Sequence, residues 1–411
     1  MKSNFSFGLL SLLMAGSAYS QGLYYVGSEA QESLPLKWVV GASLIYDDNV
    51  APGFGNEEDS FAINPYVGLS FVSITPQTTI DVYARLGLIY YFDEPTTGTS
   101  DDTFSQSRVG FNVTHRFSER LRFSSRNFVS YELEPDYAYG YASSRQAGEY
   151  FYWQTDNSVG FRWTERVATY TGFTLTGADY ADVANNDRFT WLLYNQFRYQ
   201  LTPQTVLTAE YRYGDTEGDG LSSNYVDQYV LVGAEHRFSP NTIGIIRAGA
   251  QFHSVEDGDD QTSPYLELAL NSQVNQQFSI RGFVRYGIEN YDTVRFISDP
   301  AVLAPAEFDS RKTLRLGISS EYVLSQKLSL FGGVDYIPSS FEDGRALAPA
   351  PAGAPVDDAD ESLVNAFVGF SVRFTDMLTG TVSYNYTHQT SDFDGQDYNR
   401  NRISVGLSAE F

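Results

Sequence analysis

The chain has 411 residues, with 27 Lys or Arg and 51 Asp or Glu, and the formal net charge of −24 argues against nucleic acid as a partner. The absence of cysteine excludes disulfides and thiolate metal sites, and only four histidines are present. A mean hydropathy of −0.29 excludes a bundle of transmembrane helices. It leaves open a membrane β-barrel, in which only alternate residues of each strand face lipid.

The first 20 residues have the pattern of a secretory signal peptide. Lys2 gives a short positive start, and an apolar stretch runs from Phe7 to Ala15. Ala18-Tyr19-Ser20 then places small residues at the positions that a signal peptidase reads. Cleavage after Ser20 is expected, which removes Lys2 and leaves a mature charge of −25. The protein is therefore predicted to be exported.

The remainder of the chain repeats one pattern, an alternating strand that ends on an aromatic residue. Odd positions from Ile403 to Phe411 are apolar and even positions are small or charged, which is the period of a strand with one apolar face. The pattern recurs from Val109 to Phe117, from Val230 to Phe238 and from Val368 to Phe374. A polar turn of a few residues follows each of these three segments, and a second alternating strand leaves each turn.

These units predict an all-β fold, an antiparallel transmembrane β-barrel of about 18 strands, with 16 as the alternative count. Residues 21–35 are expected to form a short periplasmic segment, and residues 36–411 a single barrel. Short turns at one end and long loops at the other are typical of bacterial outer-membrane barrels. The expected strands are 36–46, 60–73, 79–92, 102–117, 121–133, 150–163, 167–178, 188–201, 205–214, 225–238, 242–254, 263–274, 278–290, 311–323, 327–338, 362–374, 378–389 and 399–411.

Arginine is confined to one parity of these strands, the parity opposite to Phe411. An arginine facing lipid at the bilayer midplane costs about 2–4 kcal/mol, so this segregation indicates an inner, water-facing side. Fifteen arginines and Lys37 stand there against nine acids, an excess of seven positive charges. The expected pore-lining residues are Arg85, Arg108, Arg122, Arg126, Arg162, Arg198, Arg212, Arg247, Arg281, Arg285, Arg315 and Arg373.

Glycine also recurs on the inner parity, for example at Gly41, Gly110 and Gly317. Small residues there leave room for large neighbours and permit curvature. They favour an open bore, and packing around a filled interior is the alternative.

No catalytic residue, metal site or cofactor is expected, and the protein is predicted not to be an enzyme. His115 and His236 each precede Arg-Phe at a strand end, which suits an interfacial residue. His253 and His388 lie in no recognisable catalytic motif. The long loops are acidic, and Asp257-Gly258-Asp259-Asp260 lacks the full spacing of a calcium loop. A solvated acidic rim is the favoured interpretation.

The segment Leu44-Ile-Tyr-Asp-Asp-Asn-Val50, at the end of the first expected strand, resembles the Tyr-Asp-Asp-Asn signature near the start of the putative outer-membrane β-barrel porins of type 2. The hairpin repeat and the terminal Phe411 resemble that family along the whole mature chain. The resemblance implies a bacterial outer-membrane location and a genomic association with exopolysaccharide systems. It also implies that Phe411 is the signal read by the barrel assembly machinery. It names no solute.

The sequence therefore predicts a channel for passive diffusion of small solutes, with a mild anion preference. A plugged structural or surface-polymer-associated barrel is one alternative, and a lipid-modifying barrel enzyme is the other. Outer-membrane lipid, the assembly machinery and small solutes are the expected partners. Loops near 47–59, 93–101, 215–224 and 341–361 are expected outside the cell, and turns near 75–78, 118–120 and 239–241 in the periplasm.

Overall fold

The computed structural model describes residues 33–52, 57–93, 101–133, 149–181, 187–219, 223–256, 258–289, 293–299, 302–347, 353–393 and 395–411. The signal peptide and its cleavage site, most of the 21–35 segment and Asp257 lie outside these ranges. Within them there is no helix with the length and apolar character that crossing a bilayer requires.

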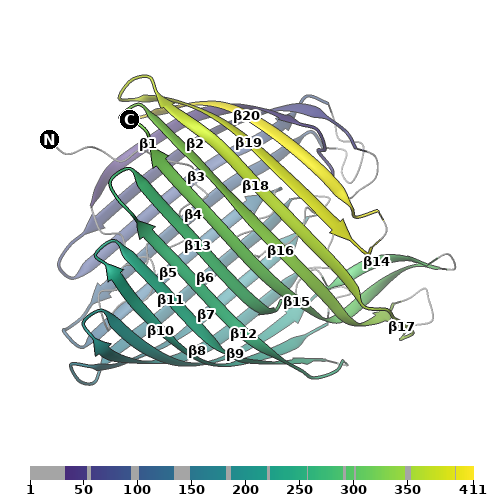
Figure 1. The fold of residues 1–411 in the computed structure, drawn as a ribbon, viewed down its shortest axis with the longest axis horizontal. Helices are drawn as coiled ribbons and strands as arrows, with labels where there is room; N and C mark the ends of the chain where they lie inside the picture. Colours follow the sequence, from purple (N-terminus) through teal and green to yellow (C-terminus); the bar gives the residue numbers. More distant parts are fainter. Residues whose placement is uncertain are drawn as a thin grey trace.

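The described residues form one closed antiparallel sheet, shown in Figure 1 as a tilted near wall crossing the far wall behind it. The strands of the wall are β1 (Leu34–Asp47), β2 (Ser60–Ile74), β3 (Thr78–Tyr91), β4 (Thr103–Arg116), β5 (Leu121–Glu132), β6 (Tyr150–Arg162), β7 (Val167–Tyr180), β8 (Arg188–Thr202), β9 (Thr205–Gly218), β10 (Tyr225–Ser239), β11 (Thr242–Val255), β12 (Gln261–Gln273), β13 (Phe278–Ile288), β15 (Val302–Val323), β16 (Leu328–Ala346), β18 (Ala359–Arg373), β19 (Leu378–Ser391) and β20 (Tyr398–Glu410). Two further strands, β14 (Val294–Asp299) and β17 (Pro355–Val356), lie beside the long hairpin of β15 and β16.

Each wall strand pairs with its neighbour along the chain, and β1 closes the ring by pairing with β20 from Val39↔Glu410 to Asp47↔Arg402. The barrel thus has 18 strands, which confirms the fold class and favours 18 over 16. A transmembrane strand tilted by about 45° needs about 9–11 residues. Every wall strand, from 11 residues in β13 to 22 in β15, is long enough to cross a bilayer.

The eight short connections contain two to four residues, and a short polar side chain caps each of them. A Ser, Thr or Asn at the start of the turn accepts hydrogen bonds from backbone N–H groups two or three residues later. Ser118 Oγ accepts from Arg120 N (3.2 Å) and Leu121 N (3.0 Å), and Asn275 Oδ1 accepts from Gln277 N (2.8 Å) and Phe278 N (2.9 Å). The other capping residues are Thr75, Thr164, Thr202, Ser239, Ser325 and Thr375.

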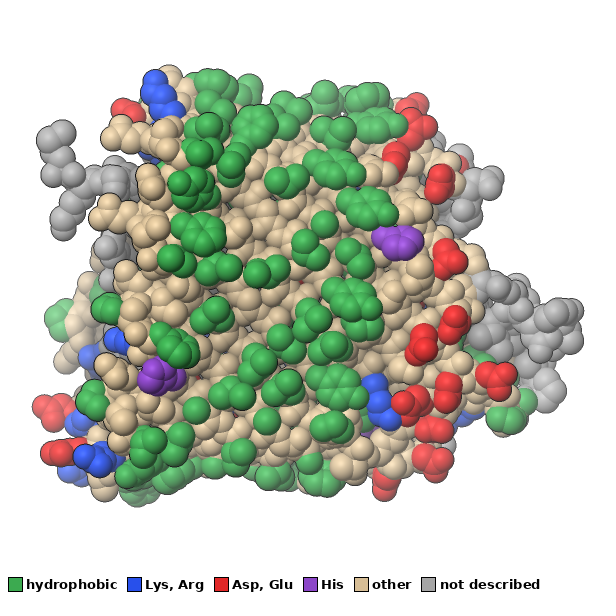
Figure 2. Space-filling model, in the orientation of Figure 1, with side chains coloured by type: hydrophobic (Ala, Val, Ile, Leu, Met, Phe, Trp, Pro, Cys, Tyr) green, Lys and Arg blue, Asp and Glu red, His purple; other side chains and the backbone are tan. Residues whose placement is uncertain are grey.

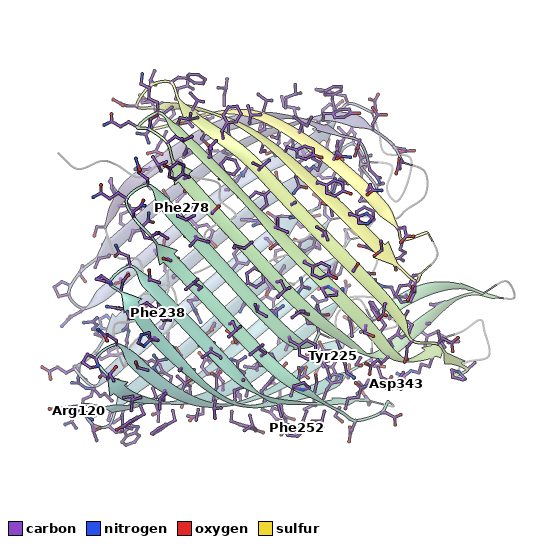
Figure 3. The ribbon with its side chains drawn as sticks, viewed as in Figure 1. Arg120, Tyr225, Phe238, Phe252, Phe278 and Asp343 are labelled. Atoms are coloured by element: carbon purple, nitrogen blue, oxygen red, sulfur yellow. The ribbon has the colours of Figure 1, made fainter. Side chains whose placement is uncertain are left out.

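The outer parity carries the apolar side chains. Val232 is 65% exposed, Leu407 is 54% exposed and Phe411 is 63% exposed, because none of the residues that the structure describes covers these side chains. Hydrophobic side chains spread over the wall in Figure 2, and Asp and Glu gather at the end where the long loops lie. In Figure 3, Phe238 and Phe278 mark the short-turn end and Asp343 the opposite end. An apolar belt between two polar ends is the surface of a transmembrane barrel.

The hairpin of β15 and β16 extends farther than the sequence pattern predicts. β16 continues to Ala346 and β18 begins at Ala359, so part of the loop expected at 341–361 is strand. The four strands β14 to β17 project beyond the rim at the right of Figure 1. Glu307 accepts a hydrogen bond from Ser223 N (2.6 Å), and Asp309 accepts one from Asp259 N (3.0 Å). These two bonds hold the extension against two neighbouring loops.

Candidate functional site

The twelve expected pore-lining arginines all lie on the face opposite to the exposed apolar residues. In β13, Arg281 and Arg285 alternate with outer residues, and in β5 Arg122 and Arg126 do the same. The structure therefore brings the set together as the charged inner wall of the barrel. Their role in permeation stays a prediction.

The central feature of this wall is a belt of three arginines and three glutamates on β8 to β12, called here the charge belt: Arg198, Arg212, Arg247, Glu210, Glu235 and Glu267. Arg198 Nη2 lies 2.6 Å from Glu235 Oε2, and both side chains are about 1–2% exposed. Arg247 lies 2.8 Å from Glu267 and 3.7 Å from Glu210. Arg212 lies 2.5 Å from Glu210. The charge belt is therefore neutral in sum, and its alternating charges hold each other in place.

Other arginines of the set also meet carboxylates. Arg315 and Arg285 share Glu289, with Arg315 at 2.8 Å. Arg126 lies 2.6 Å from Asp156.

Arg108 pairs with Glu132, and Arg162 lies 3.9 Å from Glu119 at the short-turn end. At the seam between β1 and β20, Asp47 is fully buried and binds Arg400 at 2.6 Å and Arg402 at 3.3 Å. At least eight of the twelve expected pore-lining arginines therefore lie within 4.0 Å of a carboxylate.

Arg85 is held differently, because its hydrogen-bond and stacking partners are neutral. Its Nη2 donates to Asn64 Oδ1 (3.0 Å), and its guanidinium stacks on the Tyr66 ring, 4.0 Å from the centroid. Its cross-strand partner in the register is Arg108. Arg85 is therefore a site of net positive charge on the described inner wall.

Solvent reaches part of this wall from inside the barrel. The side chains of Arg126, Arg285 and Glu267 are 35%, 33% and 28% exposed although they face away from the outer surface. They lie on β5, β13 and β12, near mid-height of their strands. An 18-stranded wall is wide enough for an aqueous lumen.

Aromatic rings on the inner wall lie over glycines of the neighbouring strand. A Cβ built on the glycine would approach a ring atom to between 2.0 and 2.7 Å, so only glycine admits the ring there. In each case the two residues are direct partners in the strand register. The seven pairs are Gly41–Tyr66, Gly110–Tyr83, Gly160–Tyr170, Gly172–Tyr194, Gly317–Phe283, Gly333–Phe367 and Gly369–Phe331.

The histidines occupy structural positions. His115 Nδ1 lies 2.8 Å from Thr78 Oγ1, and the His115 ring packs edge-on against Phe117. His236, at the end of β10, has the same arrangement with Thr205 and Phe238. His253 is buried, and its Nδ1 lies 2.9 Å from Asp227 Oδ1. In the part of the chain that the structure describes, no group of three or more His, Asp or Glu is arranged to hold a metal ion.

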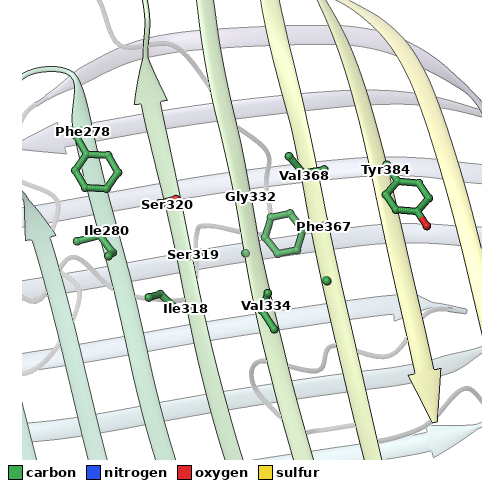
Figure 4. A pocket seen from close by; sticks show the side chains of 12 residues that line it. Phe278, Ile280, Ile318, Ser319, Ser320, Gly332, Val334, Phe367, Val368 and Tyr384 are labelled. Carbon is green, nitrogen blue, oxygen red and sulfur yellow. The ribbon is translucent and has the colours of Figure 1, made fainter.

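A depression of about 400 Å³ is lined mainly by residues on the outer parity of β13, β15, β16, β18 and β19. Ser320, Gly332, Ile318, Val334 and Val368 are among the residues that line it (Figure 4). Its lining is apolar, as expected of a surface in contact with lipid.

No family model matches the chain, and no curated protein matches it in sequence. Among solved structures, the chain is similar to the outer-membrane protein OpdK of Pseudomonas aeruginosa, at 13% identity and a TM-score of 0.46, covering 92% of this chain and 99% of that one. It is also similar to a BenF-like porin of Pseudomonas fluorescens, at 10% identity and a TM-score of 0.46, covering 92% of this chain and 98% of that one. A third similar structure is OccAB4 of Acinetobacter baumannii, at 13% identity and a TM-score of 0.43, covering 92% of this chain and 99% of that one. At these identities and scores the function has to be argued from the wall itself.

Proposed function

We propose that this protein is a channel for the passive diffusion of small solutes across the bacterial outer membrane. The observation that carries the proposal is a closed 18-stranded wall whose outer face is apolar and whose inner face holds charged side chains in contact with solvent. Such a wall combines a lipid-facing surface with a polar path through it. Outer-membrane lipid, the barrel assembly machinery and small solutes are its partners.

The ion pairs of the inner wall predict weak selectivity. Each arginine of the charge belt lies beside at least one glutamate, so a passing ion meets both signs at short range. Arg85, whose partners are neutral, leaves a local positive charge. A mild anion preference that declines as salt rises follows from this balance, because mobile ions screen the remaining charge.

Single-channel recording in a planar bilayer tests the proposal. Steady ohmic steps with a reversal potential slightly on the anion side are expected in a salt gradient. Electrical silence of correctly folded protein would favour a plugged barrel associated with surface-polymer systems. Release of fatty acid or an altered lipid from vesicles would instead favour a lipid-modifying enzyme, and either result would overturn the channel.

A further inference from the structure

The stack of Gly41, Tyr66 and Arg85 shows how a large side chain can be accommodated on the inner wall. Gly41 is the register partner of Tyr66, and a Cβ at Gly41 would lie 2.5 Å from Tyr66 Cζ and 2.6 Å from its hydroxyl oxygen. The three nearest atoms to that position all belong to the Tyr66 side chain. The guanidinium of Arg85 in turn stacks on the same ring. The ring therefore lies along the wall, in the space that a side chain at position 41 would occupy.

We infer that the glycines opposite inner aromatic residues set the width of the bore, and hence the size of solute that passes. The inference rests on the proposed channel function. A bulky side chain at position 41 fills the place of the Tyr66 ring. Because β1 occupies the wall side, the ring and the guanidinium stacked on it must move toward the lumen. Glycine across from an aromatic residue thus keeps a large ring out of the path of solutes.

The same arrangement recurs in other sectors of the barrel. The three nearest atoms to a Cβ built on Gly110 all belong to Tyr83, the closest at 2.0 Å, and those to a Cβ built on Gly160 all belong to Tyr170, the closest at 2.3 Å. Gly317 meets Phe283 at 2.1 Å. Since these pairs lie on different strands, the effect is a property of the wall rather than of one strand.

A double-mutant cycle on the Gly41–Tyr66 pair tests the inference. Gly41→Val should lower single-channel conductance and the size limit for sugars in a liposome-swelling assay. Tyr66→Ala alone should change conductance little, because the ring already lies along the wall. The double variant should regain at least the parent conductance. This rescue separates a narrowed bore from general damage, since two structural defects would add.

The matched control is Gly282→Val, on the outer face, where the nearest atom to a built Cβ is the Gly317 carbonyl oxygen at 3.6 Å. It should leave conductance and the size limit unchanged. Folding of Gly41→Val is checked by heat-dependent gel mobility. If this variant does not fold, the same double-mutant cycle is made on the Gly317–Phe283 pair, with Gly317→Val, Phe283→Ala and the double variant. Equal conductance of the parent and the glycine variant, or no rescue in the double variant, would overturn the inference.

A second readout separates this inference from the channel proposal. The chain has no cysteine, so Lys37→Cys places a single thiol on the inner parity of β1, between Gly41 and the short-turn end, where the parent side chain is 21% exposed. Thiol reagents of increasing size should label it more slowly in the Gly41→Val background, and the delay should grow with reagent size. This delay is expected even if the parent shows no conductance. Size-independent labelling would contradict the inference without bearing on ion flow.

Discussion

Replacing Arg198 by methionine should strongly destabilise the folded barrel, because it leaves Glu235 buried without its main partner. The two side chains are about 1–2% exposed and are joined by two hydrogen bonds of 2.7 and 2.6 Å. Breaking a buried ion pair from one side costs about 3–5 kcal/mol. Arg247 lies 4.0 Å from Glu235 and compensates in part. We therefore expect the lower end, about 3 kcal/mol, or roughly a hundredfold in the folding equilibrium constant.

The assay is reversible urea unfolding in detergent micelles, followed by the fluorescence of the four tryptophans. Arg198→Met combined with Glu235→Gln should cost clearly less than the sum of the single changes, because neither charge is then left alone. The matched control is Arg162→Met, whose partner Glu119 is 95% exposed at 3.9 Å and should contribute little. Similar small losses in both arginine variants, with additive behaviour in the cycle, would refute the view that burial makes the Arg198–Glu235 pair important.

Three further outcomes are expected. Deleting Phe411 should lower the folded, heat-modifiable fraction, since the terminal aromatic is expected to engage the assembly machinery; a normal folded yield would contradict this. Single cysteines at Asp59 in a long loop and Asn241 in a short turn should label from outside intact cells only at position 59, and the reverse pattern would invert the topology. Replacing Arg281 and Arg285 by glutamine should move the reversal potential toward cations, because two inner positive charges are lost; an unchanged potential would locate selectivity elsewhere.

The wall strands could be predicted from sequence because two local signals agree. Alternation fixes which residues face lipid, and the Ser, Thr or Asn of each short turn fixes where a strand ends. The β15–β16 extension could not be predicted in this way. Residues 302–310 contain Pro305 and show no clean alternation, and Phe308, Asp309 and Ser310 are all buried because other elements cover both faces. Only tertiary contacts make that segment a strand.

The inner arginines could be predicted by parity, but their partners could not. Asp47 and Arg400 are 353 positions apart and meet only because β1 closes on β20. Arg126 and Asp156 are direct partners on β5 and β6. The connection between these strands is long, so the sequence does not give their register. The alternation of apolar and polar residues predicts which face of the sheet a side chain lies on. Charge pairing also depends on the register between neighbouring strands, which alternation does not give. The positive excess was therefore visible in the sequence, and the carboxylate partner of each arginine was not.

The same holds for the glycines. Their place on the inner parity follows from the sequence, and so does the idea that they make room for large neighbours. Which ring uses the room depends on register: Gly110 lies under Tyr83 of β3, and Gly160 under Tyr170 of β7. The sequence favoured an open bore but kept a filled interior as the alternative, because the direction in which a ring lies is a matter of packing.

At the seam, β1 and β20 pair as two strands joined by a short turn would, so a turn could link them without changing the sheet. Trp38 N donates to the Phe411 carbonyl oxygen (3.0 Å), and Phe411 N donates to the Trp38 carbonyl oxygen (2.8 Å), so the two ends already meet as neighbouring strands do. A circular permutant that joins them through a short capped turn and opens the chain between β11 and β12 would keep every strand pair. In such a permutant Phe411 remains in the wall but is no longer terminal. Its insertion efficiency would therefore show whether the assembly machinery needs this residue as an end of the chain or as part of the sheet.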